Sequence, residues 1–203
     1  MKSRIIFVLT TLVLIFGINK FTLRKDVNKL IENINTVNIS GKQRMYSQKI
    51  SKQALFYLKD IKNITANNAN LNKSVQSFSA AHNKLKNDLP RQDDDYLNDL
   101  FKELDPYFNT IVDNVNELTS NSLSKFEIIE SVNKISSSAN NFLPIMDSIV
   151  GQYETVGRER GEIVLQRELT FNIILIVLFT YSLIFIIIPA IRTFDESEKF
   201  SFF

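Results

Sequence analysis

Between residues 20 and 166, apolar side chains recur at alternating spacings of three and four, the pattern of amphipathic helices. Polar clusters at residues 65–70, 88–93 and 119–122 divide this stretch into four segments. The inward positions expected in the last three segments are Leu71, Val75, Phe78, His82, Leu85 and Leu89; Leu97, Leu100, Leu104, Phe108, Ile111, Val115 and Leu118; and Ile128, Val132, Ile135, Ala139, Phe142, Met146, Ile149, Tyr153 and Val156. The sequence therefore predicts an all-α fold, an antiparallel four-helix bundle with up-down-up-down topology.

Prolines and an acidic cluster give the expected helix ends. Pro90 disfavours helix at the residue before it, and Asp93 is expected to cap the helix that follows. Pro106 lies inside the third segment and predicts a kink or an early break, and Pro144 is expected to bend the fourth.

Two apolar segments without charged residues flank the predicted bundle, at residues 5–18 and 171–188. At about 1.5 Å per residue the second is long enough to cross a bilayer, and its length favours a membrane span over a buried core helix. The first is short and follows basic residues, as in a cleaved signal peptide. Because it ends without a small-x-small cleavage pattern, we interpret it as an uncleaved signal anchor.

The first segment of the bundle carries a polar interruption in its apolar spacing. Val27, Leu30, Ile34 and Val37 precede it and Leu55 and Leu58 follow it, but the positions between them in the same register are Gly41, Arg44, Gln48 and Ser51. A seam along this register would bury an arginine, which is costly unless the charge is paired. The interruption is therefore a candidate anion site.

The fork-shaped guanidinium of Arg44 suits the oxygens of a small planar anion or a carboxylate. Gly41 lets a ligand or a backbone approach closely, and Asn38, Ser47 and Gln48 are candidate hydrogen-bonding neighbours. The alternative is a structural ion pair inside the bundle, for which the conceivable partners of Arg44 are Asp105, Asp113 and Glu117.

Composition excludes several functions. The 203 residues carry a formal charge of +2 without a long basic run, so nothing predicts a nucleic-acid partner. The chain has no cysteine and one histidine, so thiolate and His-pair metal sites are ruled out and no cofactor is predicted. Without a phosphate loop or a nucleophile–base pair, we expect no enzyme activity. His82 is expected to be a packed histidine, with a proton switch as the alternative.

Residues 38–50 resemble the signature of the PilJ-type sensor domain, found at the N-terminus of type IV pilus chemotaxis transducers and many bacterial membrane receptors. They are also similar to the box of NarX-type nitrate/nitrite sensor kinases. The positions that match that box are Asn38, Gly41, Arg44, Met45 and Ser47. A second stretch, residues 142–154, resembles the closing helix of the PilJ-type domain.

Together with the two apolar segments, the resemblance implies a two-pass protein of the bacterial cytoplasmic membrane, in contact with lipid and working as a homodimer. Its parts are then a first transmembrane helix with its flank at residues 1–25, an extracytoplasmic sensor bundle at 26–166, a second transmembrane helix at 167–191 and a short cytoplasmic tail at 192–203. In the nitrate sensors the arginine matching Arg44 binds the anion at the dimer interface. Gln43 and Gln48 differ from the nitrate box, so the expected ligand is a small anion, either nitrate/nitrite-like or a carboxylate.

The sequence thus favours a sensory input module that transmits a helix shift across the membrane. Receptors of this type normally continue into an output domain, and none follows here, so we expect a truncated receptor or a separate signalling output protein. The alternative is a membrane-anchored scaffold that binds a protein without a small ligand. A chemotaxis-type receptor fragment lacking its methylated helices is a third possibility. An exposed apolar stripe on the second or third helix favours the scaffold.

Overall fold

The computed structural model describes residues 2–59, 64–88, 94–120 and 123–189, and every element in these ranges is helical. The elements are α1 (Lys2–Lys59), α2 (Ile64–Asp88), α3 (Asp95–Thr119), α4 (Lys125–Ser182) and a π-helical turn, η3 (Leu183–Ile187). The chain divides into two compact units. One is the bundle, Glu32–Gly157, and the other combines Met1–Ile31 with Arg158–Phe203. The predicted all-α fold is confirmed.

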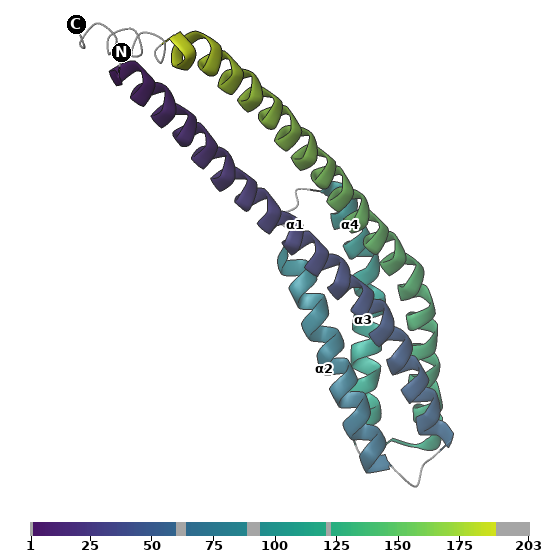
Figure 1. The fold of residues 1–203 in the computed structure, drawn as a ribbon. Coiled ribbons are helices and arrows are strands. Elements are labelled where there is room, and N and C mark those ends of the chain that lie inside the picture. The colour runs from purple at the N-terminus through teal and green to yellow at the C-terminus, as the bar shows by residue number, and fades with distance from the viewer. Residues whose placement is uncertain (1, 60–63, 89–93, 121–122, 190–203) are drawn as a thin grey trace, which may run out of the picture. The chain divides into compact units, whose positions relative to one another are not determined.

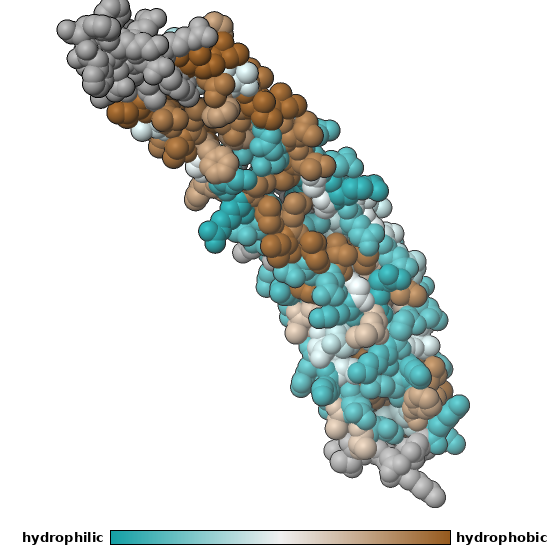
Figure 2. Space-filling model, in the orientation of Figure 1, coloured by the Kyte–Doolittle hydropathy of each residue, from teal (hydrophilic) through white to brown (hydrophobic). Residues whose placement is uncertain are grey.

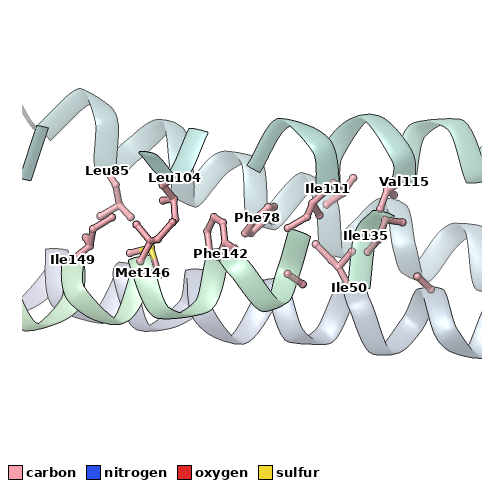
Figure 3. Packing of buried hydrophobic residues seen from close by; sticks show 14 of the residues in the cluster. Ile50, Phe78, Leu85, Leu104, Ile111, Val115, Ile135, Phe142, Met146 and Ile149 are labelled. Carbon is pink, nitrogen blue, oxygen red and sulfur yellow. The ribbon is translucent and has the colours of Figure 1, made fainter. Parts of the chain in front are cut away.

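In the bundle unit, four helices pack side by side in antiparallel order (Figure 1). Aromatic and branched side chains from all four helices point toward one another in its centre (Figure 3). On α2, α3 and α4 the inward positions expected from the spacing are buried or partly buried, and Leu89 lies outside the described residues. The three-four spacing of these helices therefore predicted their inner faces correctly.

The predicted inner face of α1 is partly wrong. Ile34, Gln48 and Leu55, expected on the seam, are exposed. Of the predicted seam, Ser51 is buried and Val37 and Leu58 pack partly buried against the core. The other positions that α1 buries were not predicted: Asn33, Thr36, Ser40, Gln43, Ser47, Ile50, Ala54 and Tyr57. Two buried amides on this face use their N–H groups as donors to backbone carbonyls of neighbouring helices. The Asn33 amide donates to the carbonyl of Tyr153 at 3.0 Å, and the Gln43 amide donates to that of Phe78 at 2.9 Å.

The predicted helix ends are partly wrong. The cluster at residues 65–70, expected to be a turn, lies within α2. The expected effects of Pro90 and Asp93 lie outside the described residues. Pro106 and Pro144 both lie inside their helices, and neither ends its helix. Tertiary packing of α2 therefore outweighs the weak helix preference of its asparagine-rich first turns.

Short side-chain contacts set the starts of α3 and α4. Ser124 and Glu127 form a capping box at the start of α4, because the Ser124 amide donates to Glu127 Oε2 at 2.7 Å and the Glu127 amide donates to Ser124 Oγ at 3.4 Å. Hydrogen bonds from the Ser124 side chain and backbone amide to the Glu127 carboxylate lower its pKa. At the start of α3, Asp94 accepts a hydrogen bond from the Leu97 amide at 3.1 Å and a second from the Gln152 side chain at 2.7 Å.

Replacing Asp94 with alanine is expected to lower the free energy of unfolding by about 1–2 kcal/mol, because it removes both the cap of α3 and its bond to α4. Denaturant unfolding followed by circular dichroism measures the change. Asp95→Ala is the matched control, since Asp95 is exposed in the first helical turn, and it is expected to change stability much less. Equal losses in the two variants would contradict the capping role.

The second unit holds the segments that are long and apolar enough to cross a membrane, within the helices Ile6–Lys59 and Lys125–Ile186. Figure 2 shows their hydrophobic surface in brown, in contrast with the mostly hydrophilic surface of the bundle. Polar side chains join the two helices beside these segments. Asn19 donates to Glu168 at 3.1 Å, Lys20 lies 3.6 Å from the same carboxylate, and Asp26 pairs with Arg167. Two candidate membrane helices were predicted, and both are present as helices.

Candidate functional site

The residues of the polar segment lie on α1, but most of them face away from the bundle core. Ile34, Asn38, Gly41, Met45 and Gln48 follow one another at alternating spacings of four and three, so they share one face of the helix. Ile34 and Met45 are 65% and 53% exposed, Asn38 and Gln48 are exposed, and Gly41 is partly exposed. We call these five residues the outer stripe of α1.

Arg44 lies beside this stripe and pairs through its Nε with Asp147 Oδ1 on α4. Both side chains are nearly half exposed, at 43% and 46%. An ion pair this open to water contributes about 1 kcal/mol or less, because solvent screens the attraction and two long side chains lose freedom. Among the described residues, the Arg44 guanidinium makes this ion pair and no other polar contact. Arg44 is therefore held in place but keeps donors for a ligand.

The other predicted site residues differ in their positions. No heavy atom outside its own helix lies within 4 Å of a Cβ built on Gly41, so the structure of one chain places nothing against it. Gln48 donates weakly to the carbonyl of Ala139 on α4, at 3.4 Å. Ser47 is buried, and its hydroxyl donates to the carbonyl of Arg44 in its own helix at 2.9 Å. Asn38, Gly41 and Gln48 thus share the outer stripe beside Arg44, whereas Ser47 lies on the opposite, inner side.

The partner of Arg44 was not predicted, because Asp105, Asp113 and Glu117 were considered and all three lie on α3. In an up-down-up-down bundle the first helix is adjacent to the second and the fourth, while the third lies diagonally across. The predicted topology therefore already pointed to α4, where Asp147 lies. Gln43 was also missed: it was read only as a difference from the nitrate box, yet its buried amide joins α1 to α2.

A second polar group lies between α2 and α3. The buried His82 ring stacks on Phe108, with ring centroids 3.8 Å apart, and its Nε2 lies 3.0 Å from Asp105 Oδ1. Lys86 binds the other oxygen of Asp105 at 2.6 Å. Burial lowers the pKa of His82, and outweighs Asp105, which acts in the opposite direction. The ring is then neutral at pH 7, with Nε2–H donating to Asp105.

A shallow groove of about 560 Å³ adjoins this group, between α2 and α3. It is lined by Lys86, Asp95, Asn98, Asp99, Phe101, Lys102 and Asp105. Both lysines are already paired, Lys86 with Asp105 and Lys102 with Asp99 at 2.8 Å. Both positive charges of the groove are therefore already bound by carboxylates. In the part of the chain that the structure describes, no three acidic or histidine side chains are grouped so as to hold a metal ion.

The described residues form a helical bundle and include two helices that are long and apolar enough to cross a membrane. Residues 34–141, more than half of the chain, match the PilJ family, described as the N-terminal domain of type IV pili methyl-accepting chemotaxis transducers. The chain therefore belongs to this family and is a sensory input module of the chemotaxis-transducer kind. No curated protein matches it.

Proposed function

We propose that the chain senses a small anion, nitrate, nitrite or a small carboxylate, which binds beside Arg44 where the outer stripes of two copies meet. The site includes Asn38, Gly41 and Gln48 of each copy. Ser47, the remaining residue of the predicted site, lies on the inner side of α1 and acts by fixing the helix that carries Arg44.

The outer stripe is the observation that carries this proposal. Its alternating four-three spacing is the one that lets two helices pack along a shared seam. The stripe begins with the exposed Ile34 and continues through the exposed Met45, with polar residues between them. The open space at Gly41 gives a second helix room for close approach. A second copy fits this surface because the same stripe then meets itself across a two-fold axis.

The positive charge of Arg44 favours an anion where the outer stripes of two copies meet. Two Arg44 side chains brought together repel each other, and a small anion between them relieves the repulsion through charge-assisted hydrogen bonds. Asp147 is the ion-pair partner of each guanidinium, and the side chain is 43% exposed, which leaves it accessible to the ligand. The similarity of residues 38–47 to the nitrate-sensor box makes nitrate and nitrite the first anions to test.

Binding at this place suits transmission, because α1 continues without interruption from the site to the first candidate membrane span. We infer that the anion changes the position of α1 relative to α4, and that α4 carries the change into the second span. Such a two-state shift needs a ligand that binds one position of the helices better than the other.

The scaffold alternative is not favoured. It needs an exposed apolar stripe on α2 or α3, and within the described residues of these two helices Tyr96 is the only large hydrophobic side chain that is exposed. A single exposed aromatic residue is normal for a protein surface.

Nitrate, nitrite or a small carboxylate is expected to raise the unfolding temperature of the full chain in detergent, and Arg44→Ala is expected to abolish the rise. Lys42→Ala is the matched control, because it removes one positive charge from an exposed position on the same helix. Asp147→Asn is expected to strengthen binding, since it removes the carboxylate that competes for the guanidinium. The unfolding temperature is measured with and without each anion for the wild type and for the Arg44→Ala, Lys42→Ala and Asp147→Asn variants. If no anion stabilises the wild type, or if Arg44→Ala responds equally, the proposal is wrong.

A further inference from the structure

Charge is divided unequally between the two halves of the bundle. Residues 33–87, which include the bundle part of α1 and almost all of α2, carry nine lysines and arginines against one acidic residue, Asp60. Residues 88–157, which include α3 and the bundle part of α4, carry thirteen aspartates and glutamates against four basic residues. One pair of helices is therefore basic and the other acidic, an asymmetry that predicts a charged partner.

Four exposed lysines form what we call the basic face: Lys42 and Lys49 on α1, and Lys73 and Lys84 on α2. The two on α1 are seven residues apart, and the first directly precedes Gln43, whose amide binds α2. The two on α2 lie nine residues before and two residues after His82, which places them on the side of α2 turned away from α3. None of the four forms an ion pair with a residue that the structure describes.

The outer face of α3 carries five exposed acidic residues, which we call the acidic ridge: Asp95, Asp99, Glu103, Asp113 and Glu117. At about 100° per residue they fall within an arc of about 80°. In the described part of the chain, Glu103 and Asp113 form neither an ion pair nor a hydrogen bond. Because α3 lies diagonally across the bundle from α1, the ridge and the basic face are on different sides and cannot neutralise each other within one chain.

The free charges of the two surfaces lie at matching heights along the bundle. The 3.0 Å contact of His82 with α3 shows which heights on the two antiparallel helices correspond. Counted from this contact at about 1.5 Å per residue, Glu103 is level with Lys84, and Asp113 lies within one residue of the height of Lys73. The two lysines and the two carboxylates are thus each about 15–17 Å apart along the axis.

A second copy of the chain is the partner that fits this arrangement. Copies held in one membrane by the same two spans stand parallel and at the same height, so the basic face of one copy meets the ridge of another without a vertical offset. A single exposed ion pair contributes little in water. Several pairs act together here, however, and anchoring in one membrane raises the effective concentration of the copies.

We propose that neighbouring copies of the chain associate side by side in the membrane, with the basic face of one against the acidic ridge of the next. Lys73 then lies opposite Asp113, and Lys84 lies opposite Glu103. The contact joins two different surfaces, so each added copy leaves one basic face and one ridge free, and rows or closed rings result. It uses neither Arg44 nor the outer stripe, and it rests on the two spans crossing the membrane, not on the binding of an anion.

Thiol cross-linking of the full chain in membrane vesicles tests this contact, because the chain has no cysteine of its own. Ala80→Cys places a thiol within the basic face, and Thr110→Cys places one on the ridge. Copies of the two kinds are produced together and treated with a bifunctional maleimide. Cross-linked pairs are expected from the mixture and not from either kind alone, and fewer at about 1 M salt, where the Debye length is about 3 Å. Ser137→Cys, exposed on α4, replaces the ridge thiol as the control for chance collisions.

Reversing the charges tests the electrostatic basis of the contact. Glu103→Lys/Asp113→Lys in the copies with the ridge thiol is expected to abolish cross-linking, because like charges then face each other. Adding Lys73→Glu/Lys84→Glu to the other copies is expected to restore it, because both surfaces are then exchanged. All four residues are exposed, so the variants are expected to fold, which circular dichroism checks.

Glu130→Lys/Glu154→Lys is the matched control, since it makes the same change of charge at exposed positions of α4 and is expected to keep the cross-link. The inference is overturned if the mixture cross-links no more than the chance control, if the reversed ridge still cross-links, or if the double exchange fails to restore pairs. If only the lysine reversal abolishes cross-linking, the basic face binds a different anion and the side-by-side contact is wrong. No nitrate is added, so the result is independent of the proposed anion site.

Discussion

Replacing Phe78 with alanine is expected to lower the free energy of unfolding of the bundle by about 3–5 kcal/mol. The side chain is 0% exposed, and its ring lies 5.0 Å from that of Phe108 on α3 and 5.2 Å from that of Phe142 on α4. The residue also joins α1, because its carbonyl accepts the Gln43 amide. A cavity here opens where four helices meet, and the rigid surroundings cannot close it fully.

Denaturant unfolding followed by circular dichroism measures this loss in the full chain in detergent. Phe126→Ala is the matched control, because it removes an identical side chain from α4 at a position that is 74% exposed. The control is expected to change stability by less than about 0.5 kcal/mol. A loss below about 1 kcal/mol for Phe78→Ala would show that this site is not the centre of the core.

The inner faces of α2, α3 and α4 could be predicted from sequence because apolar burial alone decides them. On α2, Leu71, Val75, Phe78 and Leu85 lie on one helical face, and that face meets the other helices. A periodic apolar pattern predicts a buried face correctly whenever the element has only one apolar face to bury.

The inner face of α1 could not be predicted in this way, because its apolar residues follow two different faces. Ile34 and Met45 lie on the outer stripe, where the rule expects polar residues. Asn33 and Gln43 lie inside, where hydrogen bonds to the carbonyls of Tyr153 and Phe78 offset the cost of burying them. These bonds depend on the positions of two other helices and are not encoded in the local pattern.

The candidate site was predictable in its residues but not in its orientation. The motif match singled out Arg44 and its neighbours, whereas the register assigned to α1 placed them inside the bundle. The structure places Asn38 and Gln48 on the exposed side and pairs Arg44 with Asp147. Asn38 and Gln48 are exposed, and among the described residues nothing lies against Gly41, as the proposed shared site requires.

Acid is expected to destabilise the bundle through His82, beginning as the pH falls below about 6.5, the ordinary pKa of histidine. The imidazole is buried against Phe101 and Phe108, and burial lowers its pKa. The unfolded chain therefore binds a proton at a pH where the folded chain does not, so stability falls with pH in this range. One proton gives a slope of at most about 1.4 kcal/mol per pH unit.

The loss ends once the pH falls below the lowered pKa of the folded state, where both states carry the proton. Protonation also places a second N–H on Nδ1, which is buried and has no partner among the described residues. His82→Gln removes the titrating group and keeps a side-chain amide that can reach Asp105, so this variant is expected to lose less stability between pH 6.5 and 5.5. Denaturant unfolding at a series of pH values compares the two proteins. If the stability of both proteins falls equally with pH, the titration of His82 does not cause the loss. The contacts of Asp105 with His82 and Lys86 then join α2 to α3 without making the bundle sensitive to acid.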